Sequence, residues 1–276
     1  MLVPIEPPIA PMLARRADVI PTGEAFLYEP KWDGFRALAF RGEQHLMLQS
    51  RDLKDIGRYF PELRDPLLEA LPAGTVVDGE IVIALGDSER ILDFDALLAR
   101  IHPAASRIDR LARETPASYV LFDLLAIDGE DLRATPFGEC RARLLDRFSS
   151  LEPPLHVTPS TEEVSVARDW FHRFEGAGLD GVVAKRRDLA YEPGKRSMIK
   201  VKHDRTADCV LGGFRWHKGG EGRSVGSLLL GLYDSRGLEH VGVAASFGAA
   251  MRARLARELA PLVLGADEAH PWRSEH

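Results

Sequence analysis

The chain has 276 residues, of which 45% are hydrophobic and 28% charged, and its formal net charge is −6. This length predicts two domains, and the acidic balance argues against a protein that coats nucleic acid indiscriminately. No apolar run approaches the roughly 20 residues of a membrane span, and the N-terminus lacks the features of a signal peptide, so we expect a cytoplasmic protein. The two cysteines, Cys140 and Cys209, form no CxxC pair or His/Cys cluster, so we expect neither a disulfide framework nor a structural zinc site.

The first residues predict an extended arm, because prolines stand at positions 4, 7, 8 and 11. A short strand over residues 25–28 then delivers the octet Glu-Pro-Lys-Trp-Asp-Gly-Phe-Arg at 29–36. A lysine in water has a pKa of about 10.4, so it attacks an electrophile only where its surroundings favour the neutral form. Trp32 would exclude water and Gly34 would let backbone approach a ligand. The octet therefore indicates a nucleophilic Lys31, although a strand followed by a polar turn also produces this pattern by accident.

The next stretch predicts a hairpin, a helix and two strands. Residues 36–40 and 46–49 read as a hairpin, residues 61–71 as a short helix, and residues 76–82 and 118–127 as strands, the last ending at an Asp-Gly turn. Within 76–82 the two-residue period places Asp78 and Glu80 on one face. Carboxylates among β-branched residues are costly to bury, so a positive group is expected to meet them.

Two helices and two lysine-bearing strands follow. Residues 137–148 predict a helix, and a second helix is expected to start at Ser160, where Ser-Thr-Glu-Glu has the spacing of a capping box. Residues 180–185 and 198–202 predict strands, and Lys200 and Lys202 share one face of the second. From position 185 to 218 there are ten Lys or Arg and four Asp or Glu. The stretch either faces phosphates or is a solvated basic surface without a partner.

The character of the chain changes after residues 203–205. Strands are predicted at 209–216, 227–233 and 238–246, separated by glycine-rich turns, with a helix at 251–264. Several antiparallel strands and one helix in so short a segment are typical of an OB-type β-barrel, which commonly binds oligonucleotides. We therefore expect a domain boundary near residue 203 that acts as a hinge.

Six short motifs follow one another in a fixed order. They are Lys31-x-Asp33-Gly34-x-Arg36, Ser50-Arg51, Asp78-Gly79-Glu80, Leu121-Phe122-Asp123, Asp180-Gly181-Val182-Val183-Ala184-Lys185 and Lys200-Val201-Lys202. The series resembles the covalent nucleotidyltransferases, and is most similar to ATP-dependent DNA ligases of the small bacterial ligase C group. The resemblance covers essentially the whole chain.

The resemblance implies an α+β fold. Residues 1–202 would form an adenylation (nucleotidyltransferase) domain of antiparallel sheets with flanking helices, and residues 203–276 a small OB-type β-barrel. The chain ends at Pro271-Trp272-Arg273-Ser274-Glu275-His276 without the basic motif that orients pyrophosphate in the family. On this comparison we expect the barrel to be incomplete and self-adenylylation to be impaired.

The resemblance also implies a reaction. Lys31 would take AMP from ATP through a phosphoramidate, AMP would pass to the 5′-phosphate of a DNA break, and the 3′-hydroxyl would then displace it. Each step is phosphoryl transfer, so Mg²⁺ or Mn²⁺ is expected. The implied partners are nicked or gapped double-stranded DNA and repair polymerases, with no membrane, for a monomer acting in DNA repair.

Site roles carry over by matching position. Glu29 would read the adenine edge and Phe122 would stack on the base. Arg36, Arg51 and Glu80 would hold the ribose and nearby groups, Lys185, Lys200 and Lys202 would meet phosphates, and Glu80 and Asp180 would hold the metal. Taken alone, Glu80 could be a strand-edge surface residue, Phe122 a core residue, Lys185 and Lys200 solvated, and Arg51 a turn cap. Two positions depart from the family: Asp180 replaces the usual Glu, which calls direct metal contact there into question, and Met198 replaces an aromatic residue.

The second domain is expected to bind DNA through Arg205, Arg215 and Lys218. Three other functions share parts of this pattern: an RNA ligase, a capping-type guanylyltransferase, and a non-catalytic module that only binds a nick. Glu29 and the ligase-like order of motifs favour ATP over GTP. Covalent labelling by ATP or by GTP would separate the enzymes from one another and from the binding module.

Overall fold

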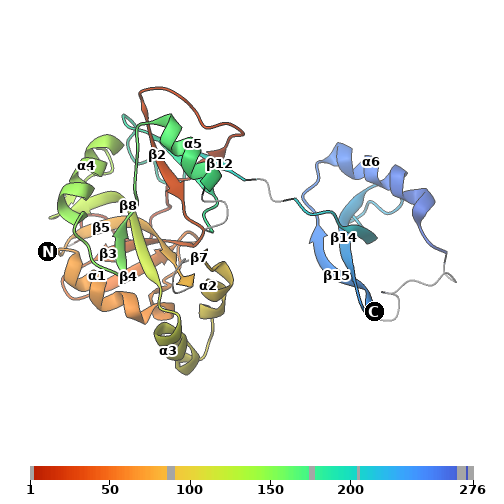
Figure 1. Ribbon diagram of the computed structural model, residues 1–276, viewed down its shortest axis with the longest axis horizontal. Coiled ribbons are helices and arrows are strands. Elements are labelled where there is room, and N and C mark those ends of the chain that lie inside the picture. The colour runs from red at the N-terminus through yellow and green to blue at the C-terminus, as the bar shows by residue number, and fades with distance from the viewer. Residues whose placement is uncertain (1–2, 86–90, 174–177, 204–205, 266–271, 273–276) are drawn as a thin grey trace. The chain divides into compact units, whose positions relative to one another are not determined.

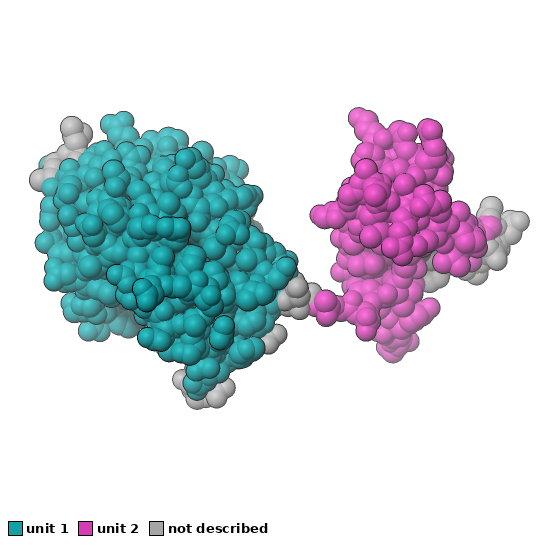
Figure 2. Space-filling model, turned by 90° about the horizontal axis from the view of Figure 1, so that it is seen from above, with its two compact units in different colours: residues 1–203 teal, residues 204–276 magenta. Residues whose placement is uncertain are grey.

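The computed structural model describes residues 3–85, 91–173, 178–203, 206–265 and 272 (Figure 1). Two compact units divide the chain, residues 1–203 and residues 204–276, coloured separately in Figure 2. In the described part of the chain, no helix is both long and apolar enough to cross a membrane.

The first sheet of unit 1 has the order β1 (Ala14–Arg16), β12 (Met198–Lys202), β11 (Gly181–Arg186) and β2 (Phe26–Lys31). One face of it packs against α5 (Val164–Arg173), where Tyr28, Val182 and Val201 meet Ala167 in a buried apolar cluster. Side chains alternate between the two faces of a strand, so the residues between these point the other way. The opposite face carries Glu29, Lys31, Val183, Lys185, Lys200 and Lys202. In the strand register Glu29 and Lys200 lie opposite Val183, and Lys31 and Lys202 lie opposite Gly181.

The second sheet has the order β10 (Leu155–Val157), β8 (Ser118–Ile127), β5 (Thr75–Val82), β3 (Phe35–Arg41) and β4 (Leu46–Ser50), and β9 (Glu130–Asp131) pairs with β8. The largest core lies on one face, beneath α1 (Arg64–Ala70) and α4 (Phe137–Phe148). The members of this core on the central strands alternate along β3, with Ala37 and Ala39, and along β5, with Val77 and Ile81. On β8 they are Tyr119, Leu121, Leu124 and Ile127, where the alternation is interrupted and the pairing with β5 is irregular. The polar residues between them, including Arg36, Asp78 and Glu80, therefore face away from that core.

The proline-rich N-terminal segment packs along the other face of this second sheet. Ile5 and Ile9 are buried in a cluster with Leu38 and Phe40. The backbone N–H of Ile9 donates to the Gln49 side chain at 2.9 Å, and the Gln49 amide donates back to the Ile9 carbonyl at 2.7 Å. These contacts confirm the prediction of an arm that lies along the domain surface.

Several predicted elements are confirmed to the residue, namely β8, α4 and β12, and the hairpin is confirmed as β3 and β4. The expectation of purely antiparallel sheets is wrong at two edges, because β1 pairs with β12 and β10 pairs with β8 in parallel. Both added strands have only three residues. So short a strand shows no recognisable period in sequence.

The predicted helix start at Ser160 is also wrong, because α5 begins at Val164. Thr161 lies extended beside β2 and exchanges two backbone hydrogen bonds with Tyr28, of 2.8 and 3.0 Å. The Ser160 hydroxyl accepts a hydrogen bond from Arg141. The sequence from Ser160 favours the start of a helix, but the pairing of Thr161 with Tyr28 in the folded protein outweighs this local preference.

Residues 83–117, for which no element was predicted, contain the hairpin β6 (Ala84–Leu85) and β7 (Ile91–Leu92), then α2 (Phe94–Arg100) and α3 (Ala105–Glu114). A capping residue marks the first helix, because the Asp93 side chain accepts from Ala96 N–H at 2.8 Å. The helix predicted at 61–71 is shorter than expected: a 3-10 turn at Pro61–Leu63 precedes α1.

Unit 2 has a three-stranded antiparallel sheet of β13 (Val210–Trp216), β14 (Val225–Asp234) and β15 (Gly237–Ala244), and α6 (Ala249–Leu259) packs on it. Arg252 of α6 donates hydrogen bonds to the carbonyls of Phe247, Val225, Gly226 and Ala245, which fixes the helix to the sheet. The described residues of this unit form an open sheet and show no closed barrel. The predicted helix at 251–264 is shorter, because a 3-10 turn at Ala260–Leu262 follows α6.

Candidate active site

Lys31 is the last residue of β2 and lies on the face of the first sheet opposite α5. Gly34, three residues later, lies so close to β5 that a Cβ there would clash with the backbone carbonyl of Ile81. The glycine is therefore needed for the approach of two backbones rather than for the approach of a ligand, which was the expected reason. This close approach fixes the turn that follows Lys31.

Asp180 joins two of the lysines of the first sheet. Its Oδ2 atom lies 2.9 Å from Lys31 Nζ and also forms an ion pair with Lys202 Nζ. Burial would raise the pKa of Asp180, but hydrogen bonds from Lys202 and Lys31 outweigh it and hold the pKa below its ordinary value. Gly181 follows with a φ of +139°, and a Cβ there would clash with the Val201 carbonyl, so only glycine fits at this point. The carboxylate is thereby held against β12.

Lys200 completes a cluster of three ammonium groups, which we call the lysine cluster: Lys31, Lys200 and Lys202. Burial lowers the pKa of Lys200, and the charges of Lys202 and Lys31 lower it further. No ion pair links Lys200 to another residue in the described part of the chain. Three cations against the single carboxylate of Asp180 leave a positive site that favours an anion such as a phosphate.

Arg36 supplies the positive group that buried Asp78 requires. Its Nε and Nη2 atoms donate to the two Asp78 oxygens at 2.9 and 2.6 Å, and its Nη1 donates to the Met12 carbonyl at 2.5 Å. The Tyr191 hydroxyl also donates to Asp78, at 2.8 Å. Burial lowers the pKa of Arg36, but Asp78 more than offsets this and raises it above the ordinary value. Much of the hydrogen-bonding capacity of Arg36 is therefore used within the protein.

Glu80 lies opposite Arg36 in the strand register, and its side chain has no hydrogen bond or ion pair with another described residue. Burial raises its pKa to about 8, and the positive charges of Lys31 and Arg36 offset only part of this rise. Glu80 is thus a carboxyl group whose oxygens no other described residue engages, and the charge of Lys31 acts on it. Glu80 is therefore not a surface residue at the edge of a sheet, because β5 lies between β8 and β3.

Phe122, Lys185 and Glu29 meet where the two sheets face each other. The Lys185 ammonium lies 2.8 Å from Glu29 Oε2, 3.3 Å from the Phe122 carbonyl and 4.7 Å from the Phe122 ring centroid. The Arg36 guanidinium lies 5.4 Å from the same ring. Lys185 and Glu29 are almost fully buried, with side chains 4% and 3% exposed. Lys185 is therefore not solvated, and the structure does not place it with the lysine cluster.

The ring of Phe122 is half-buried and belongs to none of the apolar clusters of unit 1. Two cations lie near its ring, and it is not packed among aliphatic side chains. The next residue, Asp123, is buried, and burial raises its pKa to about 7, while Lys185 lowers it and Asp78 and Glu29 raise it further. The pair thus combines an aromatic ring accessible from the site with a buried carboxyl behind it.

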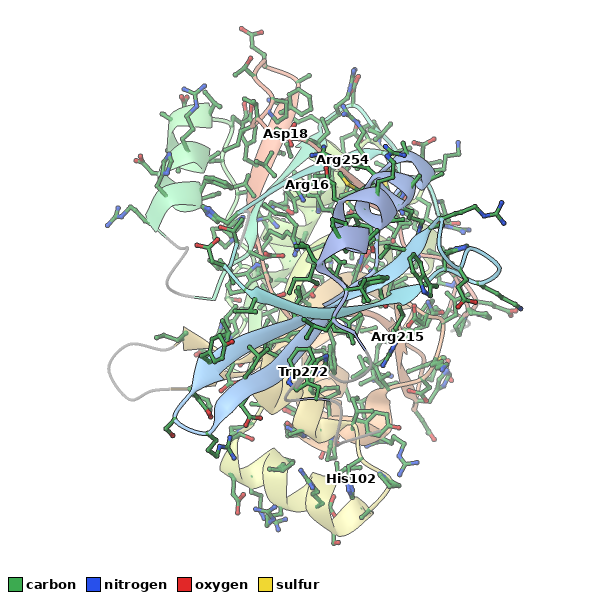
Figure 3. All side chains as sticks on the ribbon, turned by 90° about the vertical axis from the view of Figure 1, so that its right-hand side faces the viewer. Arg16, Asp18, His102, Arg215, Arg254 and Trp272 are labelled. Atoms are coloured by element: carbon green, nitrogen blue, oxygen red, sulfur yellow. The ribbon has the colours of Figure 1, made fainter. Side chains whose placement is uncertain are left out.

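Some predicted residues lie apart from this group. Arg51 is in the turn after β4, its side chain 71% exposed and 3.9 Å from Asp52. In unit 2, Arg215 is exposed on β13 (Figure 3). Lys218 is exposed in the turn that follows this strand. Arg205 lies outside the described residues. Met198 is buried at the start of β12, where it pairs with Ala14.

Arg141 was not predicted as a site residue, yet it reaches Glu29. It lies on the buried face of α4 together with Phe137, Leu144 and Phe148. An arginine at 141, among apolar residues at 137, 144 and 148, was the available signal, because these positions share one helical face.

The described residues contain no group of three or more His, Cys, Asp or Glu side chains that could hold a metal ion. Mg²⁺ is commonly held by one or two carboxylates with substrate phosphates and water completing its shell. Glu80 has free oxygens for such a role, whereas Asp180 is engaged by two lysines. The donor set therefore fits a divalent ion that binds together with a phosphate ligand.

Comparisons with known proteins agree on one family. The family model described as "ATP dependent DNA ligase domain" matches residues 11–202. DNA ligase C2 of Mycolicibacterium smegmatis is 50% identical over 273 residues, covering 99% of this chain and 75% of the relative. DNA ligase C of Mycobacterium tuberculosis is 49% identical over 277 residues, with the same coverage. Among solved structures, mycobacterial DNA ligase D complexed with ATP and MES matches with a TM-score of 0.59 and 32% identity, covering 95% of this chain and 80% of that one.

Proposed function

The chain belongs to the ATP-dependent DNA ligases, and on this premise we propose that Lys31 is the residue that carries AMP from ATP to DNA. The observation that supports this best is the lysine cluster. Lys31 stands beside Lys200 and Lys202 on one sheet face, and its charge acts on Glu80 of the facing sheet. A nucleophile, cations for phosphate and a free carboxylate thus meet at one place.

In the first step, Lys31 Nζ loses a proton and attacks the α-phosphorus of ATP. A nitrogen–phosphorus bond forms, and the bond from the α-phosphorus to pyrophosphate breaks. Lys200 and Lys202 would neutralise charge on the transferred and leaving phosphates. For Nζ to attack, it must leave the ion pair with Asp180, and the neighbouring Lys202 can keep that carboxylate paired.

In the second and third steps, AMP activates the DNA end. An oxygen of the 5′-phosphate at a nick or gap attacks the phosphorus of AMP, and the nitrogen–phosphorus bond to Lys31 breaks. The 3′-hydroxyl then attacks the 5′-phosphorus, the phosphodiester bond forms and AMP leaves. We place this joining in DNA repair, where repair polymerases would prepare the ends, with the chain acting as a monomer.

The nucleoside would bind between the two sheets. Phe122 would stack on adenine, because it is half-buried and its ring centroid lies 5.4 Å from the Arg36 guanidinium. Glu29 would read the base edge with Oε1, which has no hydrogen-bond partner in the described structure. Arg36, Glu80 and Arg51 would hold the ribose and nearby groups, and Lys185 would support Glu29 and approach phosphate only if that ion pair opened. Glu80 and Asp180 would hold Mg²⁺ or Mn²⁺, which would supply charge neutralisation on the phosphates.

DNA would bind through the second unit. We assign residues 1–202 to the adenylation domain and 203–276 to an OB-type domain, with a hinge near residue 203 that lets the same site meet ATP and then DNA. Arg215 and Lys218 are exposed cations on or beside β13 and would contact backbone phosphates.

The test is covalent labelling with α-labelled ATP and Mg²⁺ or Mn²⁺. Wild type should acquire an acid-labile label, at the slow rate that the expected impairment of self-adenylylation implies. Lys31→Ala has no nucleophile in its side chain and Lys31→Arg has a guanidinium that stays protonated, so neither should acquire label. Thermal unfolding of each variant serves as the folding control. Label on the folded alanine variant would refute the assignment of Lys31, and a wild type that binds nicked DNA but never becomes labelled would favour a binding module without catalysis.

A further inference from the structure

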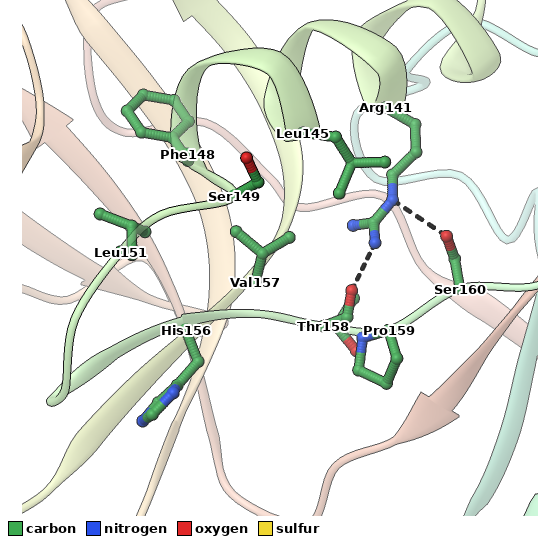
Figure 4. Close-up of a pocket in the computed structure, with 10 residues that line it drawn as sticks. All are labelled: Arg141, Leu145, Phe148, Ser149, Leu151, His156, Val157, Thr158, Pro159 and Ser160. Atoms are coloured by element: carbon green, nitrogen blue, oxygen red, sulfur yellow. Dashed lines mark hydrogen bonds between the residues drawn. The ribbon is translucent and has the colours of Figure 1, made fainter.

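Arg141 is a buried arginine that none of the steps above uses. Its side chain is 4% exposed and projects from α4 toward the segment that follows β10. Figure 4 shows its guanidinium turned to that segment, where Nε donates to the Ser160 hydroxyl at 3.2 Å and Nη2 donates to the Thr158 carbonyl. A buried guanidinium is expensive to desolvate, so the groups that it meets indicate what it does.

The first of these groups is Glu29, two residues before Lys31. Arg141 Nη1 lies 3.9 Å from Glu29 Oε1, and neither atom has a hydrogen-bond partner in the described structure. Burial lowers the pKa of Arg141, and the negative charges of Glu29 and Asp123 counteract this. Lys185 holds the other Glu29 oxygen. The carboxylate is therefore held between two cations, one from α4 and one from β11.

The second group is Thr158, which connects Arg141 to the residue after Lys31. The Thr158 carbonyl accepts from Arg141, and its hydroxyl accepts from the Trp32 indole N–H at 2.8 Å. Thr158 is 1% exposed, so both acceptor oxygens belong to a buried residue, whereas Trp32 is half-buried. Arg141 thus acts on the chain at two points that flank Lys31: Glu29 on one side and, through Thr158, Trp32 on the other.

We propose that Arg141 is a positioning residue for the nucleophile: it fixes the end of β2 on both sides of Lys31, so that Nζ is aimed at the α-phosphorus. The inference rests on the proposed role of Lys31 but not on any contact between Glu29 and adenine. Loss of such positioning lowers the rate of the chemical step more than it weakens ATP binding, because the phosphate and base contacts remain.

Arg100 offers a matched control. It is fully buried, pairs with both oxygens of Glu62 at 2.7 and 2.8 Å, and donates to the carbonyls of Tyr59 and Thr115. In the part of the chain that the structure describes, the contacts of Arg100 are with Glu62, Tyr59, Thr115 and the ring of Phe60, none of which is a candidate site residue. Arg141→Met removes a buried cation beside Glu29, and Arg100→Met removes a buried cation away from the site. If either methionine variant fails to fold, Arg141→Lys and Arg100→Lys are used in its place.

The experiment first measures the thermal unfolding midpoint of each variant. Single-turnover adenylylation of Lys31 is then measured over a range of ATP concentrations, at a temperature well below the lowest midpoint. Arg141→Met should lower the maximal rate about ten- to a hundredfold, as misplacement of a reacting group does, with a smaller change in half-saturating ATP. Arg100→Met should lose thermal stability and keep the maximal rate within about twofold of wild type. Thr158→Val, which removes only the bond to Trp32, should give an intermediate rate, and Arg141→Lys should recover part of the loss by restoring the charge.

Two results would overturn the inference, and they differ. A wild type without label would refute the proposed function and this inference with it. A labelled wild type, with Arg141→Met as fast as Arg100→Met, would leave the proposed function standing and reduce Arg141 to a structural residue.

Discussion

Replacing Lys185 by methionine should destabilise unit 1 strongly. The side chains of Lys185 and Glu29 are 4% and 3% exposed and their charged atoms lie 2.8 Å apart, so water screens the pair little. Among the described residues, the substitution leaves Glu29 and Asp123 buried with Arg141 as the cation whose charge acts on both. Removing one partner of a buried ion pair costs about 3–5 kcal/mol of unfolding free energy, and that is the loss expected at pH 8.5.

The loss should depend on pH with a definite sign. Burial already raises the pKa of Asp123 to about 7, and Lys185 is the group that lowers it, so the variant should have a still higher pKa at Asp123. A carboxyl with a raised folded-state pKa contributes stability that is complete below its unfolded pKa and is lost as pH rises through the folded value. Below about pH 7 Asp123 is protonated in both folded proteins and adds nothing to the difference between them, so the gap in stability between wild type and Lys185→Met should widen from pH 7 to pH 8.5.

Urea unfolding at pH 5.5, 7 and 8.5 measures this gap. The double variant Lys185→Met with Glu29→Gln should recover part of the loss, because the second change removes the unpaired charge. If the unfolding free energy of Lys185→Met lies within about 1 kcal/mol of that of wild type at pH 8.5, the reasoning is refuted, because removing one partner of a buried ion pair costs more than this.

Three further outcomes are expected. Glu80→Gln should flatten the fall in stability that wild type shows as pH rises from about 5 to 9, because burial raises the pKa of Glu80 to about 8; parallel pH profiles of the two proteins would contradict this. Phe122→Ala should weaken ATP binding by about 1–3 kcal/mol through lost stacking, whereas a collapsed thermal midpoint with unchanged ATP affinity would assign the ring to the core. Arg215→Ala and Lys218→Ala should each lower the slope of log affinity for nicked duplex against log salt by about one, and unchanged slopes would remove both from the DNA surface.

The strands that carry the site were predictable because their patterns are local. Lys200 and Lys202 alternate with Ile199 and Val201, and the structure places the lysines on one face and the apolar pair on the other. The same period placed Asp78 and Glu80 together, and the requirement for a positive partner was met by Arg36. Alternation along a strand fixes which side chains share a face.

What could not be predicted depends on contacts between distant segments. No local signal says that Thr161 pairs with Tyr28, which moves the start of α5 to Val164. Nothing in the sequence around Lys185 distinguishes it from a solvated lysine. Its ammonium is buried only after folding, when it lies beside Glu29 and the ring of Phe122. The role of Arg141 is equally non-local, because α4 reaches Glu29 only once both sheets have assembled.

The central claim is that Lys31 becomes covalently attached to AMP, and peptide mapping by mass spectrometry tests it most directly. Protein incubated with ATP and Mg²⁺ or Mn²⁺ would be digested, and the position of any AMP adduct would be read from fragment masses. We predict one adduct per chain, on Lys31, that disappears when nicked duplex DNA is added. An adduct on any other residue, or one that persists in Lys31→Ala, would contradict the account.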